Sequence, residues 1–210
     1  MNLAAKLDGN VSSERIIADI NFNIEKADIY RLGFYPSDLS LNSMATCEVD
    51  FTSVEDFAIF LDLQSLDFHL PDTVYKIHPV KINLSTNPSL SEFTLNSFYY
   101  NMEFSCKASF IHFLNSVNHL PGYYLSDFET DSISFSLPEF DLTGKLDFPE
   151  TFENVFFPDY PSFKKLNIDG SFNHAEDKLD FDLAITDLNF GDIVSDSFYV
   201  NIEGTSEKLK

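Results

Sequence analysis

Histidine side chains are the first candidates for chemistry in this chain, because a neutral imidazole binds metal ions and changes charge near neutral pH. None of the five histidines lies at metal-ligand spacing from another histidine, a cysteine or a carboxylate pair. We therefore expect no metal site and no cofactor. These histidines are His69, His78, His112, His119 and His174.

Cysteines and carboxylates give no catalytic constellation either. Cys47 and Cys106 lack CxxC spacing and are too few for a disulfide framework. We interpret them as small buried apolar side chains, and a bridge between them stays open. Asp180 and Asp182 alternate with apolar residues and are explained by a solvated strand face. The sequence has no GxSxG elbow and no phosphate-binding glycine loop, so we expect no enzymatic activity.

Composition indicates a folded, sheet-rich and strongly acidic protein. Of 210 residues, 44% are hydrophobic and 15% aromatic, which excludes a disordered tail. The aromatic residues are 23 Phe and 9 Tyr with no Trp, and such large side chains favour strands. A net charge of -21 repels nucleic acid, so we expect no nucleic-acid partner.

Neither a membrane-spanning helix nor a signal peptide is visible in the sequence. No run of about 18 apolar residues exists, and residues 1–8 lack the apolar core of a signal peptide. If the parent protein is exported or anchored, we expect its signal to lie outside these residues.

Alternation of apolar and polar residues, the pattern of a half-buried strand, dominates the chain. It inverts once at Gln64–Ser65, where we expect a β-bulge or a sheet corner. Short connections favour antiparallel pairing. The shorter alternating segments are residues 20–24, 39–51, 57–63, 66–70, 80–84, 133–137, 166–172, 179–185 and 198–202.

The longest alternating run covers residues 98–110 and predicts a bent strand of about 40 Å. Helical spacing follows over about 110–120, and Pro121–Gly122 should end that helix. An aromatic, proline-containing insertion at 147–161 predicts a second helical turn with a loop. We thus expect an all-β fold with one or two short helices.

A weak internal repeat suggests how the chain is organised. Tyr35-Pro36-Ser37 recurs as Tyr160-Pro161-Ser162, and each copy precedes a predicted strand. We expect residues 1–210 to form one elongated segment with two similar units, about 16–110 and 130–204. The amphipathic helix at about 110–120 would join them, and both would share one continuous sheet.

Two interpretations of the apolar stripe follow. It forms an ordinary core against a second layer, or it lines an open trough that holds acyl chains, because large exposed apolar surfaces normally bind a ligand or partner. The candidate lining residues are Leu39, Leu41, Val49, Phe51, Phe98, Tyr100, Met102, Phe104, Phe110, Leu166, Ile168, Phe172, Phe181 and Leu183.

The order of these segments resembles the periplasmic region of the TamB family (translocation and assembly module, AsmA-like), in its Bacteroidetes form. The likeness covers most of the chain and rests on the order of its segments, because each segment alone is unspecific. The segments are 49–57 (VDFTSVEDF), 63–68 (LQSLDF), 74–77 (VYKI), 80–84 (VKINL), the long run ending at Phe110, the helix with 120–123 (LPGY), 168–172 (IDGSF) and 179–183 (LDFDL).

The resemblance implies a repetitive β-sheet folded into a groove with a hydrophobic interior, in a periplasmic protein anchored in the inner membrane. It implies transport of phospholipids between the inner and outer membranes, with their acyl chains as ligands, and support of outer-membrane protein assembly. A TamA-type barrel partner would bind through regions outside these residues, so the chain would be an interior fragment.

Two other functions remain open at this point. Lipid-facing strands of an outer-membrane β-barrel show the same alternation, although the absence of Trp and the predicted helix argue against that fold. A surface adhesin or carbohydrate-binding β-sandwich would expose aromatic rings for sugar stacking, for which Tyr99, Tyr123 and Tyr124 are the candidates.

Overall fold

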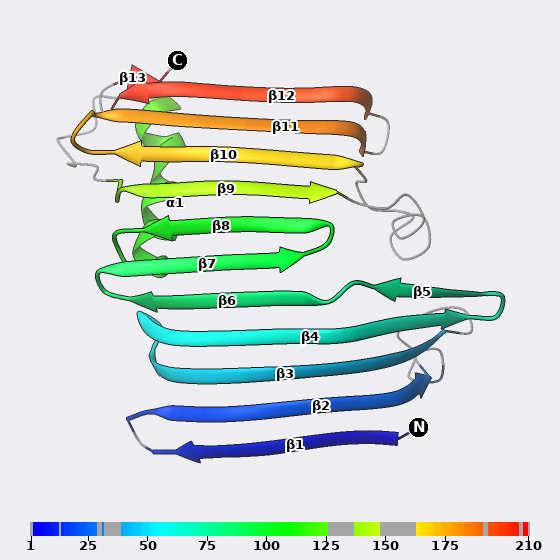
Figure 1. The fold of residues 1–210 in the computed structure, drawn as a ribbon. Coiled ribbons are helices and arrows are strands. Elements are labelled where there is room, and N and C mark those ends of the chain that lie inside the picture. Colours follow the sequence, from blue (N-terminus) through cyan, green and yellow to red (C-terminus); the bar gives the residue numbers. More distant parts are fainter. Residues whose placement is uncertain are drawn as a thin grey trace.

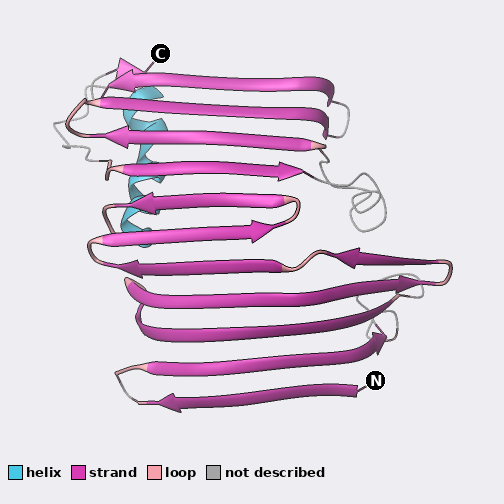
Figure 2. Ribbon diagram, in the orientation of Figure 1, coloured by secondary structure: helices cyan, strands magenta, loops and turns pink. Residues whose placement is uncertain are grey.

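A computed structural model describes residues 2–12, 14–28, 31, 39–125, 137–147, 163–190, 193–205 and 208–209. These residues form one antiparallel sheet of 13 strands and a helix, α1 (Phe110–Leu125), which lies behind the sheet in Figures 1 and 2. The strands are β1 (Asn2–Val11), β2 (Ile16–Asp28), β3 (Ser40–Ser53), β4 (Asp56–Leu70), β5 (Thr73–Ile77), β6 (Val80–Asn87), β7 (Leu90–Ser97), β8 (Tyr100–Cys106), β9 (Phe140–Asp147), β10 (Lys165–Asn173), β11 (Lys178–Phe190), β12 (Ile193–Thr205) and β13 (Lys208–Leu209).

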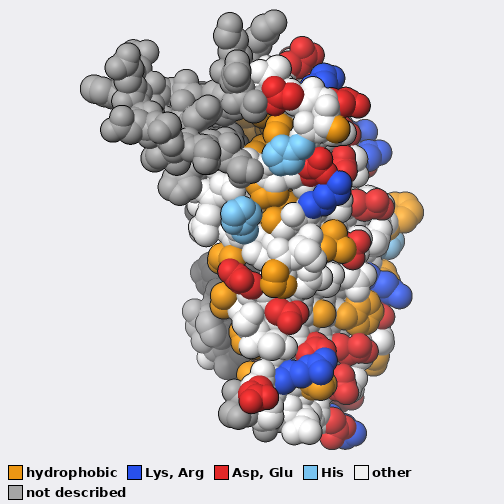
Figure 3. Space-filling view, turned by 90° about the vertical axis from the view of Figure 1, so that its left-hand side faces the viewer, with side chains coloured by type: hydrophobic (Ala, Val, Ile, Leu, Met, Phe, Trp, Pro, Cys, Tyr) orange, Lys and Arg blue, Asp and Glu red, His pale blue; other side chains and the backbone are white. Residues whose placement is uncertain are grey.

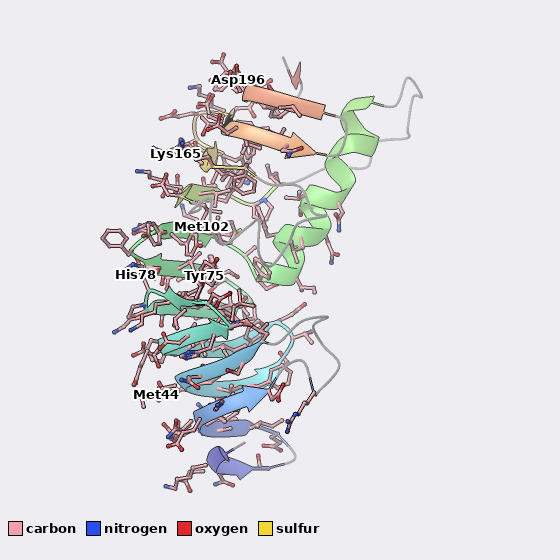
Figure 4. The ribbon with its side chains drawn as sticks, turned by 90° about the vertical axis from the view of Figure 1, so that its right-hand side faces the viewer. Met44, Tyr75, His78, Met102, Lys165 and Asp196 are labelled. Atoms are coloured by element: carbon pink, nitrogen blue, oxygen red, sulfur yellow. The ribbon has the colours of Figure 1, made fainter. Side chains whose placement is uncertain are left out.

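Strand order follows chain order, except that β5 lies off the main path and pairs with β4. The sheet stays open, with β1 at one edge and β13 at the other. Seen from the side, it curves towards the face that carries α1 (Figure 4). The predicted all-β, antiparallel and trough-like architecture is therefore confirmed.

The β-bulge predicted from the inverted alternation is present in β4. Ser65 pairs with Met44 and Leu63 pairs with Ala45, so Gln64 is the extra residue. Beyond this bulge β4 pairs with β5, whereas before it β4 pairs with β6. The single inversion in the sequence therefore marks the point where β4 changes its neighbour.

A second bulge, in β2, is stabilised by a side-chain amide. The register between β2 and β3 shifts between Ile24 and Ala27, and Lys26 has a φ of 60°. The Lys26 N–H donates to Asn42 Oδ1 over 2.8 Å, and Asn42 Nδ2 lies 3.0 Å from His69 Nε2. Because the amide nitrogen can only donate, His69 Nε2 is the acceptor in this contact.

The prediction of one long strand over residues 98–110 is wrong, because β8 contains only 7 residues, Tyr100–Cys106. Phe98 lies in the turn between β7 and β8, and Phe110 begins α1. The alternation continues across the turn before β8 and past the end of β8, where the chain leaves the sheet. The prediction that Pro121–Gly122 ends the helix is also wrong, since α1 runs on to Leu125.

Apart from the short strands β5 and β13, three strands were not identified from the sequence. In β7 only Phe93 and Leu95 are apolar on the inner face, and in β9 the pattern is interrupted at Gly144. The third, β1, does alternate, with Leu3, Leu7 and Val11 on one parity, and this signal was overlooked. Weak alternation hides β7 and β9, because their place depends on neighbours rather than on their own apolar content.

The strands before and after α1 share one sheet, because β8 pairs directly with β9. The division into units of about 16–110 and 130–204 stays a prediction. Outside the described residues lie both Tyr-Pro-Ser motifs, residues 133–136 of the predicted strand at 133–137, and residues 148–161 of the insertion.

Candidate functional site

The register of the sheet places apolar residues opposite one another from strand to strand, so that they form rows across it. One row crosses β2 to β12, and every side chain in it is half-buried. Its members are Ile20, Cys47, Leu61, Ile82, Leu95, Met102, Gly144, Ile168, Leu183 and Val200.

A parallel row lies two residues further along each strand. We call these two rows together the lane. With about 4.8 Å between neighbouring strands, the lane is roughly 43 Å long from β2 to β12. The second row consists of Phe22, Ala45, Leu63, Val80, Ser97, Tyr100, Leu146, Leu166, Ile185 and Phe198.

Gly144 leaves room in the lane for the bulky side chains of its neighbours on β8 and β10. A Cβ atom at this position would lie 2.7 Å from Ile168 Cγ2 and 3.3 Å from Met102 Cε. The side chains of Met102 and Ile168 therefore fill the space over β9, and the apolar surface continues without a gap.

Helix α1 covers the same apolar face beside the lane, over the ends of β7 to β11 (Figure 1). The Phe113 ring lies 4.8 Å from the ring of Phe104 and 5.3 Å from that of Phe140. Val117 packs against the same cluster. Beneath the helix the sheet side chains are buried: Phe104, Cys106, Phe140, Phe172 and Leu179.

A directed chain of hydrogen bonds fixes the start of α1. Ser91 Oγ donates to the Ala108 carbonyl over 2.7 Å, and Thr86 Oγ1 lies 2.7 Å from Ser91 Oγ. The Phe110 N–H donates to Thr86 Oγ1 over 3.0 Å. Because Ser91 has one hydroxyl hydrogen, Thr86 must donate to it. These hydrogen bonds run from the Phe110 N–H through Thr86 and Ser91 to the Ala108 carbonyl. They hold the backbone in the position where it turns away from the sheet.

The opposite face of the sheet is polar and acidic. Acidic and basic side chains gather on the right-hand side of Figure 3, which is the front of the sheet in Figure 1. Asp169 and Asp182 are direct cross-strand partners there. Hydrogen bonds from Asn201 and then Tyr199 lower the pKa of Asp182. Asp182 therefore keeps its charge to a lower pH than an isolated aspartate.

The predicted lining residues fall into distinct places. Met102, Ile168, Leu183, Tyr100 and Leu166 lie in the lane. Val49, Phe51, Phe104, Phe172 and Phe181 are on the same face in neighbouring rows. Leu41 lies beyond the two bulges, between Ala27 and Phe68.

The other predicted lining residues are not on the sheet. Leu39 precedes β3 and is buried. Phe110 packs from the helix onto Phe104, with ring centres 6.1 Å apart. Phe98 is 76% exposed in its turn, where its ring stacks on His78 with centres 4.8 Å apart.

Sequence reasoning missed two groups of lining residues. Leu95, Leu142 and Leu146 belong to β7 and β9, whose weak patterns concealed them. The helix residues Phe113 and Val117 were assigned to the helix but not to the wall of the trough. Their i, i+4 spacing was the available signal.

Both cysteines are free thiols. Burial raises the pKa of the Cys106 thiol to about 11. Among the described residues, no group of three or more His, Cys, Asp or Glu side chains could hold a metal ion. Within the same residues, no helix has the length and apolar character needed to cross a membrane.

The arrangement offers apolar contact along the lane and water-facing charge behind it. In comparisons with known proteins, no protein-family model, no curated protein and no solved structure matches this chain.

Proposed function

We propose that the lane binds the acyl chains of phospholipids and shields them from water. The observation that carries this proposal is the row of half-buried residues from Ile20 on β2 to Val200 on β12, whose apolar surface continues over Gly144 through its neighbours. An ordinary core would bury such a row completely.

Hydrocarbon is the occupant that fits the chemistry of this surface. Only three side chains in the lane can form a hydrogen bond, those of Cys47, Ser97 and Tyr100. No other side chain of the lane can form a hydrogen bond or an ion pair. An acyl chain needs no such partner, and each methylene removed from water contributes about 0.8 kcal/mol. Ten buried methylenes therefore contribute roughly 8 kcal/mol.

The wider role is proposed from the resemblance to TamB proteins. A trough of this kind would form part of a periplasmic, inner-membrane-anchored protein that carries phospholipids between the two membranes. Its acidic outer face would stay hydrated while headgroups remain at the open side of the trough. Support of outer-membrane protein assembly would require partners that bind elsewhere.

Native mass spectrometry with lipid extraction tests acyl-chain binding. The protein is purified without detergent from a phospholipid-containing host, beside a lane variant, Leu61→Asp with Leu183→Asp. The matched control, Asn83→Asp with Asn167→Asp, adds the same charge to the opposite face of the same sheet. We expect phospholipid on the wild type and the control but not on the lane variant. A folded wild type without lipid would make the apolar face an ordinary core.

Carbohydrate binding is a second candidate, favoured by an exposed aromatic cluster. Phe98 is 76% exposed and stacks on His78, while Tyr99 meets the His78 ring edge-on, with centres 5.0 Å apart. Exposed aromatic faces of this kind suit sugar rings. Binding to a glycan array that is lost in Phe98→Ala, with lipid content unchanged, would support this function instead.

A further inference from the structure

Helix α1 occupies surface that belongs to the trough. The row through Val49 and Ile59 is half-buried on β3 and β4, and its continuation reaches Phe104 on β8, which the helix covers. Helix α1 therefore leaves this face uncovered on β3 and β4 and covers it on β8.

The dimensions and direction of α1 suit this place. Its 16 residues span about 24 Å, which equals roughly five strand spacings. The helix runs across the strands, along the length of the trough (Figure 1). An acyl chain that follows the lane would lie in the same direction beside it.

The amino-acid composition of α1 also suits a helix that occupies apolar space in the trough. The sequence of α1 contains no Asp, Glu, Lys or Arg, in a chain of which 22% is charged. Phe113 and Val117 face the sheet, while Ile111 and Leu114 on the outer side remain 39% and 40% exposed. Both sides of the helix can therefore contact hydrocarbon.

We propose that α1 is an internal substitute for acyl chains, which lipid entering the later strands displaces from the sheet. The proposal rests on acyl-chain binding in the lane. The hydroxyl chain through Thr86 and Ser91 keeps the start of the helix attached while its body moves away. The helix thus regulates how much of the trough is open.

Two native thiols report separately on lipid binding and on helix displacement. Cys47 lies in the lane on β3 and is half-buried. Cys106 is 2% exposed beneath α1. Removal of the helix would lower the Cys106 pKa from about 11 towards its ordinary 9.0. Since the thiolate is the reactive form, alkylation near pH 8 would accelerate up to about 100-fold.

The experiment measures iodoacetamide alkylation of each thiol with and without lysophosphatidylcholine below its micellar concentration. Cys47→Ser leaves Cys106 as reporter, and Cys106→Ala leaves Cys47. We expect the lipid to slow alkylation of Cys47 and to accelerate that of Cys106. Protection of Cys47 with an unchanged Cys106 rate would overturn displacement but keep lipid binding. No change at either thiol would overturn both.

Helix variants provide an independent test without lipid. Phe113→Ser removes the ring that packs on Phe104 and Phe140, so we expect faster alkylation of Cys106. The matched control is Leu114→Ser, which changes the outer side of the same helical turn. Equal Cys106 rates in the two variants and the wild type would contradict a displaceable helix.

Discussion

The hydroxyl chain at the start of α1 predicts a measurable coupling between two residues on different strands. Ser91→Ala leaves the Ala108 carbonyl without a donor and the Thr86 hydroxyl hydrogen without an acceptor, while Thr86→Val leaves only the Phe110 N–H unpaired. At about 1.5 kcal/mol for each unpaired buried group, the two changes cost roughly 3 and 1.5 kcal/mol of unfolding free energy.

The double variant separates a coupled chain from two independent hydrogen bonds. It leaves the Ala108 carbonyl and the Phe110 N–H unpaired, but the Thr86 hydroxyl is gone. We therefore expect a loss of about 3 kcal/mol, roughly 1.5 kcal/mol less than the sum of the single changes. Urea unfolding followed by far-ultraviolet circular dichroism measures all four free energies.

A matched control is Ser85→Ala, which removes a hydroxyl from the opposite face next to Thr86 and should change stability by less than about 0.5 kcal/mol. Strict additivity of Ser91→Ala and Thr86→Val would refute the directed chain, because it would mean that neither hydroxyl depends on the other.

Three further predictions concern other parts of the sheet. Gly144→Ala brings a Cβ atom to 2.7 Å from Ile168 Cγ2, so we expect a loss of about 1–2 kcal/mol in urea unfolding. Asn42→Ala removes the amide that bridges the β2 bulge and His69, and should cost about 1–2 kcal/mol and increase amide hydrogen exchange at that bulge. The lowered pKa of Asp182 stabilises the fold above its unfolded pKa, and this contribution disappears as pH falls through the folded pKa. Asp182→Asn should therefore flatten the acid side of a plot of melting temperature against pH; an unchanged slope would contradict the assignment.

Several parts of the fold could be predicted because their signals are local. The β4 bulge is visible in sequence, since an extra residue inverts the alternation at Gln64. The end of β8 at Cys106 is not visible, because the chain is turned there by Thr86 and Ser91 on other strands. Likewise, β9 tolerates Gly144 only because Met102 and Ile168 fill the space from both sides.

The candidate site, like the fold, could be predicted only in part from the sequence. The sequence by itself determined which side chains share a face, because alternation in a strand is a property of the local backbone. It also determined that the other face is charged. Only the tertiary structure decided which apolar residues α1 buries and which remain in the lane. That outcome depends on strand register and on where α1 packs, and both result from contacts between residues far apart in the chain.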